Sequence, residues 1–230
     1  MHRLAALLLV LVAALTSPAM AQTLAYEAVA EEAAYQPETP ATAGASWRFV
    51  PAAPAELPRG IASYGPFRLL DATRAALVGV TDERSPAAFA ALLRDHPGVA
   101  MLELLDCPGT EDDRANLALG RMIRARGIAT HVPQGGSVRS GGVELFLAGA
   151  RHTADAEAEF AVHAWADEDG RGPRDYPANA PQNRAYLEYY RAMGMAPAQA
   201  AAFYAMTNSA PFESALWLSG REMGQWVRVD

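Results

Sequence analysis

Short apolar segments alternate with helical segments through the middle of this chain, and this alternation limits the fold more than any other feature. Apolar runs with the length of buried strands lie at Ala75–Asp82, Val99–Asp106 and Ile128–Pro133. Between them, Ser85–Gly98 and Glu111–Gly127 carry helix start and stop signals: Ser-Pro and Pro-Gly in the first, early acids and late arginines in the second. This order predicts parallel βαβ units with right-handed crossovers.

The pattern continues toward the C-terminus and then becomes helical. Gly142–Ala150 is predicted as a helix and Ala158–Trp165 as a fourth strand. Gln182–Met193 has an amphipathic pattern with an aromatic stripe, and Ala196–Met206 and Leu216–Met223 are predicted as further helices. We therefore expect an α/β domain with a mostly parallel sheet flanked by helices.

The first 21 residues have the pattern of a secretory signal peptide. A short basic start precedes an apolar run, Leu4–Leu15, and a small-x-small site, Ala19–Ala21. The run is shorter than the roughly 20 apolar residues of a membrane-spanning helix. We expect cleavage before Gln22 and a periplasmic or secreted protein with no membrane span after cleavage; an uncleaved anchor is the alternative.

The segment that follows differs in composition from the rest of the chain. Residues 22–57 are rich in Ala, Pro, Glu and Thr, which predicts a flexible lead-in, with an edge strand at Ser46–Val50. Residues 58–230 have the size of a single domain with a full core.

Composition excludes several classes of partner and cofactor. The formal net charge is -7 and becomes -8 once Arg3 is removed with the leader, and no Lys/Arg cluster offers a nucleic-acid or anionic-membrane surface. Cys107 is the only cysteine, so no internal disulfide can form. No Cys/His spacing suits a metal, and no glycine-rich nucleotide motif is present, so we expect neither a metal nor a cofactor.

Unusual residues gather where the predicted strands end. "DCPGTEDD" follows the second strand, "PQGGSVRSGG" follows the third, and His163 lies near the end of the fourth. In an open parallel sheet the ligand site lies at the carboxyl ends of the strands. We therefore expect these three segments to converge, with Ser140 flanked by glycine pairs at the centre.

The segment Leu102–His152 resembles the Clp-protease/crotonase superfamily, in particular its exported bacterial members. In that superfamily a strand ends in an "SPGG"-like turn, and a serine later opens a helix that closes in an "LAAG"-like segment. Here "CPGT" (Cys107–Thr110), Ser140 and "LAGA" (Leu147–Ala150) stand at those places. The resemblance covers roughly residues 61–165 and implies repeated ββα units. It also implies a homo-oligomer, as a trimer or a larger ring.

The resemblance implies a serine hydrolase acting on a peptide or ester substrate. Ser140 would be the nucleophile and His163 the general base. A serine hydroxyl attacks an acyl carbon only when a base accepts its proton and donors stabilise the resulting oxyanion. The backbone amides of Gly109 and Gly141 would supply those donors, because glycine allows a substrate carbonyl to approach closely.

Three positions depart from this pattern or stay open. Thr110 replaces the second glycine of the turn, and Arg139 stands beside the serine, where it would gate the site or bind a substrate carboxylate. Glu213 is the candidate to orient His163, with Asp167 and Asn208 as alternatives and a Ser-His dyad as another.

The same residues also have ordinary structural interpretations. Ser140 is a good N-cap residue, His163 has the setting of a satisfied core histidine, and Glu213 that of a solvated loop acid. The alternative function is then a non-catalytic envelope protein that keeps the fold as a binding or assembly module. An acyl-CoA enzyme of the crotonase branch is disfavoured, because CoA is cytosolic and this chain carries an export signal.

Overall fold

A computed structural model describes residues 57–229 of the chain. The expected leader and the lead-in with its edge strand, apart from Leu57, lie outside the described residues. The strands are β1 (Ala62–Tyr64), β2 (Phe67–Leu69), β3 (Arg74–Val78), β4 (Met101–Cys107), β5 (Ala129–Val132), β6 (Ser137–Arg139), β7 (His152–Ala154), β8 (Glu159–Val162) and β9 (Leu216–Ser219). The helices are α1 (Ser85–Asp95), α2 (Asp113–Ala125), α3 (Gly141–Leu147), the short 3-10 turn η1 (Pro173–Asp175), α4 (Pro181–Ala192), α5 (Pro197–Thr207) and α6 (Gly220–Trp226).

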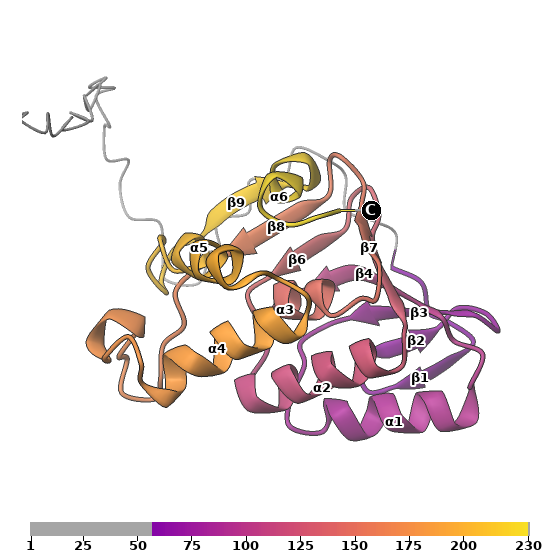
Figure 1. Ribbon diagram of the computed structural model, residues 1–230. Helices are drawn as coiled ribbons and strands as arrows, with labels where there is room; N and C mark the ends of the chain where they lie inside the picture. The colour runs from indigo at the N-terminus through magenta and orange to yellow at the C-terminus, as the bar shows by residue number, and fades with distance from the viewer. Residues whose placement is uncertain (1–56, 230) are drawn as a thin grey trace, which may run out of the picture. The chain divides into compact units, whose positions relative to one another are not determined.

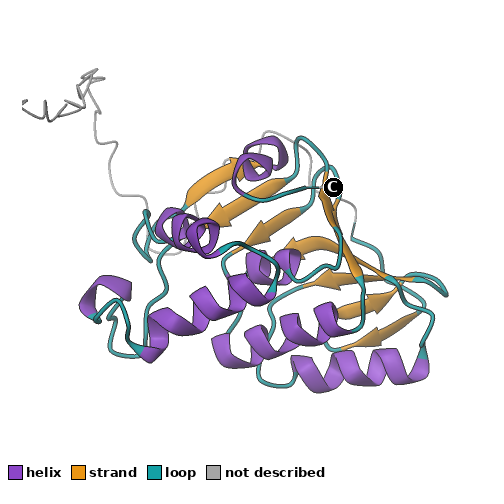
Figure 2. Cartoon of the chain, viewed as in Figure 1, coloured by secondary structure: helices purple, strands orange, loops and turns teal. Residues whose placement is uncertain are grey.

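One mostly parallel sheet organises the described residues (Figures 1 and 2). Its strand order is β1-β2-β3-β4-β6-β8-β9, with β5 beside β4 and β7 beside β5. The central pairs are parallel, and antiparallel pairs occur only toward the two edges, among β1, β2 and β3 and between β8 and β9. This confirms the expected class of fold, an α/β domain with a mostly parallel sheet flanked by helices.

Strand β4 pairs with two successive strands, and this divides the sheet. Its first half, Met101–Glu103, pairs with β5, whereas Asp106 and Cys107 pair with β6. The chain passes from β5 to β6 through a tight turn in which Gly135 has φ 77°, a conformation that favours glycine. No crossover helix is needed, and β6 delivers Ser140 to the carboxyl edge of the sheet.

Several short strands were not predicted from the sequence. The sequence pattern identifies none of β1, β2, β6 and β7, and each of these strands has only three residues. The expected helix Leu216–Met223 is wrong in its first half, because residues 216–219 pair antiparallel with β8. The helix begins at Gly220, where the Ser219 hydroxyl accepts a hydrogen bond from the Glu222 amide at 3.2 Å and the Glu222 carboxylate accepts one from the Ser219 amide at 2.7 Å.

Helix α4 is locked against α2 and α3 by a buried tyrosine. The Tyr189 hydroxyl donates to the Glu144 carbonyl oxygen at 2.6 Å. It lies so close to α2 that a Cβ atom on Gly120 would be 1.9 Å from it, which explains a glycine in a helix interior. This packing places α4 beside the carboxyl edge of the sheet.

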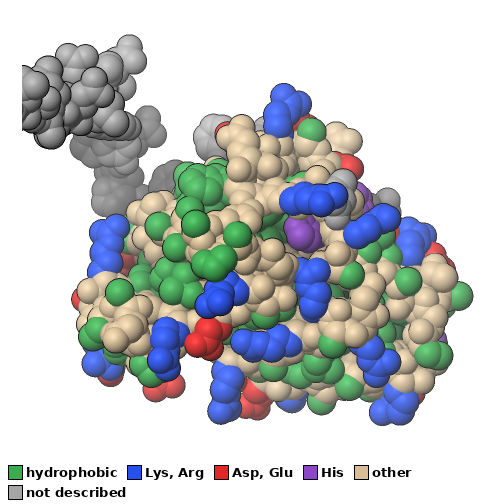
Figure 3. Space-filling model, in the orientation of Figure 1, with side chains coloured by type: hydrophobic (Ala, Val, Ile, Leu, Met, Phe, Trp, Pro, Cys, Tyr) green, Lys and Arg blue, Asp and Glu red, His purple; other side chains and the backbone are tan. Residues whose placement is uncertain are grey.

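Figure 3 shows how charged side chains are distributed over one face of the molecule. On this face the arginine side chains are scattered rather than gathered into one stripe. No helix among residues 57–229 is long and apolar enough to span a bilayer.

Candidate active site

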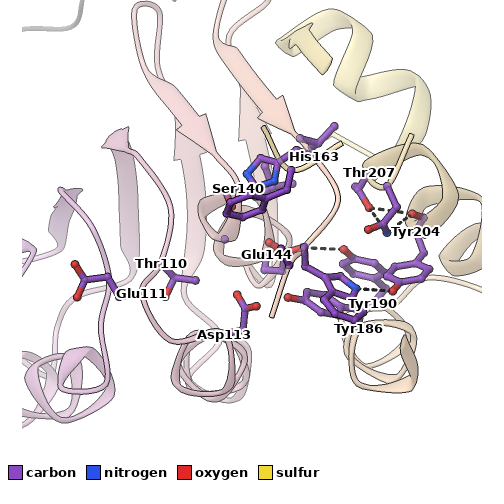
Figure 4. Close-up of a pocket in the computed structure, with 17 residues that line it drawn as sticks. Thr110, Glu111, Asp113, Ser140, Glu144, His163, Tyr186, Tyr190, Tyr204 and Thr207 are labelled. Carbon is purple, nitrogen blue, oxygen red and sulfur yellow. Dashed lines mark hydrogen bonds between the residues drawn. The ribbon is translucent and has the colours of Figure 1, made fainter. Parts of the chain in front are cut away.

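A cavity of about 210 Å³ lies at the carboxyl edge of the sheet, between the strand ends and helices α4 and α5 (Figure 4). Ser140, Gly141 and His163 all line it, and Gly109 lies directly against Ser140. The three segments after the strands therefore meet, as the parallel sheet predicts. The cavity also has a wall of aromatic residues from α4, α5 and the segment after β8.

Ser140 has a strained backbone. It is the only non-glycine residue with positive φ among residues 57–229, at φ 49° and ψ -128°. The conformation is held by two hydrogen bonds, from the Ser140 amide to the Ala161 carbonyl and from the Val143 amide to the Ser140 carbonyl, both 2.9 Å. Such a conformation costs about 1–3 kcal/mol and is concentrated at functional sites. Ser140 is the N-cap residue of α3, as its ordinary structural interpretation expects, but its hydroxyl makes no capping hydrogen bond.

The two glycines expected to form the oxyanion hole cannot be replaced without strain. Gly109 has φ 139°, and a Cβ atom there would lie 3.2 Å from the Ser140 Cβ. A Cβ atom on Gly141 would lie 2.6 Å from the Thr110 methyl carbon. Gly109 is buried, and its amide donates no hydrogen bond to any other described residue. A backbone donor is therefore left beside the serine.

A buried hydrogen-bond network fixes these turns, and sequence reasoning missed it. The Asn116 side-chain amide donates to the Gly141 carbonyl at 2.7 Å, and the Thr81 hydroxyl donates to the Asn116 side-chain oxygen at 2.9 Å. The Thr81 amide donates to the Gly109 carbonyl at 3.1 Å. Asn116 lies on the buried face of α2 with Leu119. A polar residue on an otherwise apolar helix face is the sequence feature that could have identified this network.

His163 directly follows β8 and lines the cavity in a half-buried position. Its Nδ1 atom is 2.9 Å from the carbonyl oxygen of Ala164. Since a carbonyl oxygen only accepts, Nδ1 carries the proton and Nε2 keeps its lone pair. The ring packs edge-on against Phe212, with centroids 5.2 Å apart. No hydrogen bond joins His163 to the Ser140 hydroxyl among the described residues.

The structure does not bring Glu213 together with His163. Glu213 is exposed and lines a neighbouring cavity, although Phe212 contacts the histidine ring. The alternative acid, Asp167, is paired with Arg171 and accepts a hydrogen bond from the Tyr176 hydroxyl. The Ala164 carbonyl already accepts the hydrogen bond from Nδ1 of His163, which is the nitrogen that a third catalytic residue would bind.

Asn208, the other alternative to Glu213, shares the cavity with His163. Its side-chain nitrogen donates to the Tyr204 carbonyl at 2.7 Å. Its side-chain oxygen is buried and accepts no hydrogen bond from the described residues. Asn208 thus retains an unused acceptor beside the site.

Arg139 lies outside the cavity lining. Its guanidinium is 2.6 Å from the Asp106 carboxylate, and both side chains are partly buried. The guanidinium is thus already paired within the protein, and the geometry gives no support to the expected substrate contact.

Three acids line the cavity, Glu111, Asp113 and Glu144, and none of them was identified from the sequence. Glu144 is 7% exposed and accepts a hydrogen bond from the Tyr190 hydroxyl at 2.7 Å. Burial raises the pKa of its carboxyl to about 7, and the nearby Asp113 carboxylate acts in the same direction. The pKa of Asp113 is also raised, chiefly by desolvation, although the residue as a whole is exposed. The sequence feature that could have identified Glu144 is its position as the single acid in the apolar helical segment Gly142–Ala150.

The remaining reactive groups are elsewhere. The Cys107 thiol is fully buried, and burial raises its pKa far above the usual range, so it is no nucleophile. Within residues 57–229, no three His, Cys, Asp or Glu side chains converge in a way that would hold a metal ion.

Comparisons with known proteins concern the fold. No protein-family model matches the chain, and no curated protein sequence matches it. One solved structure with a similar backbone is a mutant of the 1510-N membrane-bound stomatin-specific protease in complex with a substrate peptide. It is 13% identical over 66% of this chain and 73% of that chain, with a TM-score of 0.44. Another is a mutant of ClpP1 from Listeria monocytogenes, 14% identical over 68% of this chain and 88% of that chain, with a TM-score of 0.48.

Proposed function

We propose that this protein is an exported serine hydrolase, a peptidase or esterase, in which Ser140 is the nucleophile and His163 the general base. The observation that carries the proposal is the strained backbone of Ser140 between β6 and α3, at the edge of a cavity that also contains His163. Strained strand-to-helix turns expose the nucleophilic serine in other hydrolases. An ordinary turn or cap would not need this conformation.

The residues supply each part of an acyl transfer. The Ser140 oxygen attacks the acyl carbon and its proton passes to Nε2 of His163, while the amides of Gly109 and Gly141 stabilise the oxyanion. The imidazolium then gives the proton to the leaving group, and the acyl-enzyme is hydrolysed by water that His163 deprotonates.

The base is a histidine held by a backbone carbonyl. The chain contains no lysine, so a serine-lysine pair is excluded. The Ala164 carbonyl fixes the tautomer that leaves Nε2 free to accept the serine proton. We therefore propose a Ser-His dyad, in which Glu213 has no direct role.

Labelling with a fluorophosphonate tests this function. The wild-type protein should be labelled once, and Ser140→Ala and His163→Ala should abolish both labelling and hydrolysis of activated esters. Ser214→Ala, which removes an exposed serine hydroxyl, is the matched control and should label normally. A wild-type protein that is inert to phosphonates, esters and peptides would instead favour the non-catalytic binding or assembly function.

Export and assembly belong to the same proposal. We infer cleavage after Ala21 and a periplasmic or secreted location, from the leader pattern alone. Mass spectrometry of protein exported by the native host should find Gln22 at the N-terminus, and an intact Met1 would contradict this. Light scattering of the purified protein should give the mass of a homo-oligomer.

A further inference from the structure

We propose that the cavity beside Ser140 binds a cationic group of the substrate, the ammonium of a lysine-like or the guanidinium of an arginine-like side chain. The link to a scissile bond rests on the proposed function. The binding site itself rests on the charge, walls and size of the cavity.

The charge of the cavity is one-sided. Three acids line it, Glu111, Asp113 and Glu144, and no arginine of the described residues does. His163 is the only basic side chain in the lining. Glu111 and Asp113 are exposed, whereas Glu144 is buried, and a carboxylate taken out of water is normally paired with a cation. No arginine of the described residues forms an ion pair with Glu144, so a bound ligand would supply that cation.

Glu144 is the central acid. It is more than nine-tenths buried and lines the cavity. It belongs to α3, the helix that begins next to Ser140. One carboxylate oxygen accepts a hydrogen bond from the Tyr190 hydroxyl at 2.7 Å, and the carboxylate also accepts one from its own backbone amide. The Asn208 side-chain oxygen at the lining of the same cavity is buried and accepts no hydrogen bond from the described residues, and such an acceptor indicates a donor that is brought by the ligand.

The walls suit a cation. Trp165, Tyr186, Tyr190 and Tyr204 line the cavity, with Trp165 and Tyr186 stacked at 6.4 Å and Tyr186 and Tyr204 at 6.0 Å. The Trp165 ring nitrogen donates to the Tyr204 hydroxyl at 2.7 Å, and this hydroxyl donates to Asn183 at 2.6 Å, which fixes the rings. Aromatic faces attract ammonium and guanidinium groups, most strongly where water is excluded.

The size of the cavity indicates a side chain rather than a large ligand. Its volume of about 210 Å³ is below the roughly 300–1,000 Å³ of sites for drug-sized ligands and cofactors. Because Ser140 stands at the same cavity, a side chain bound there would belong to a residue next to the bond that is cleaved.

Binding should depend on pH. A cation stabilises the ionised form of a neighbouring carboxylate and therefore releases protons on binding. Since the pKa of Glu144 is about 7, affinity for a cation should rise between pH 6 and 8. The other titratable groups that interact with Glu144 are Asp113 on α2 and Tyr186, Tyr189 and Tyr190 on α4, and the tyrosines, whose pKa values are raised by burial, stay protonated in this range.

The experiment measures binding without turnover, in the Ser140→Ala protein. Nα-acetyl-lysine methylamide and its uncharged counterpart, Nα-acetyl-norleucine methylamide, are titrated by calorimetry and by intrinsic tryptophan fluorescence. We expect the lysine compound to bind at least tenfold more tightly. Glu144→Gln and, separately, Asp113→Asn should each reduce this preference at least fivefold. Glu188→Gln, which removes an equal charge from the exposed side of α4, should retain it.

The outcomes separate this inference from the proposed function. Equal affinity for the two compounds in the folded protein, or an equal loss in Glu188→Gln, would overturn the cationic site. A wild-type protein that labels with phosphonate but shows no cation preference refutes the site alone. A clear preference in a protein that is inert to phosphonate refutes the hydrolase alone. Circular dichroism verifies folding, and the more exposed Asp113 provides a second variant if Glu144→Gln does not fold.

Discussion

The two walls of the cavity are built in different ways. The wall that carries Ser140 is held by backbone hydrogen bonds, two constrained glycines and the buried pair Thr81 and Asn116. The opposite wall, from α4, α5 and the segment after β8, is made of tyrosine and tryptophan side chains. Backbone geometry tolerates almost no substitution, whereas aromatic side chains can be exchanged with a change of fit. Under the proposed function, the first wall would set the chemistry and the second the choice of substrate.

The largest effect is expected at Ser140 itself. Ser140→Ala should lower ester hydrolysis by about a thousandfold or more, because the members of a catalytic unit cannot be replaced singly. Stability should hardly change, since the hydroxyl caps nothing. Ser140→Gly should lose activity equally but raise the melting temperature, because glycine relieves the positive φ. Thermal unfolding and single-turnover assays measure both; a lower melting temperature for Ser140→Gly would contradict the strain.

The next effect concerns the glycine that touches the serine. Gly109→Ala should lower hydrolysis about 100-fold or more, since it displaces a backbone donor, and should cost about 1–3 kcal/mol of stability. Gly79→Ala is the matched control, because Gly79 also has positive φ, at 110°, but open space around it. The control should lose stability and keep activity. Equal activity in the two variants would show that the Gly109 amide does not contribute to an oxyanion hole.

Substitutions of two buried asparagines, one in each wall, compare the two walls directly. Asn116→Ala leaves the Gly141 carbonyl without its donor, and Asn183→Ala leaves the Tyr204 hydroxyl without its acceptor. Each should cost about 1–3 kcal/mol of stability. Steady-state kinetics should separate them: Asn116→Ala lowers kcat, whereas Asn183→Ala mainly raises KM. The same kinetic profile in both variants would contradict a division of labour between the walls.

Glu144 should make stability depend on pH. Its carboxyl has a pKa of about 7 in the folded protein, above the ordinary value of 4.5, so the folded state holds the proton more tightly. The free energy of unfolding should therefore fall as pH rises from about 4.5 to 7, by on the order of 3 kcal/mol, and level off above. Denaturant titrations of Glu144→Gln should show a smaller slope, with a remainder from Asp113. An unchanged dependence of the free energy of unfolding on pH in Glu144→Gln would show that a group other than Glu144 titrates.

The smallest effect is expected at Arg139. Arg139→Met removes a partly exposed ion pair with Asp106 and should change stability by less than about 1 kcal/mol. KM for neutral and acidic esters should change less than twofold, because the guanidinium lies outside the cavity lining. A selective rise in KM for the acidic ester would restore the substrate contact that the sequence predicts.

The sequence alone determined the class of fold and predicted that the candidate residues Ser140 and His163 lie at one cavity. The alternation of strands and helices in residues 75–165 is a local pattern, so it could be read without any tertiary contact. It follows that the loops after the parallel strands converge, and this predicts Ser140 and His163 at one edge. The glycines beside Ser140 mark close packing rather than an unusual backbone, since a Cβ atom on Gly141 would lie 2.6 Å from Thr110 and one on Gly142 2.9 Å from Cys107.

Tertiary structure decided everything that depends on distant partners. The three-residue strands β6 and β7 form because β4 and β5 offer them edges, and β9 forms because it pairs with β8. Periodicity cannot reveal such short elements, since three residues hold barely one alternation. The acidity of the cavity likewise arises from packing: Glu144 is buried by tyrosines more than 40 residues away in the sequence, and burial, not its sequence neighbours, raises its pKa.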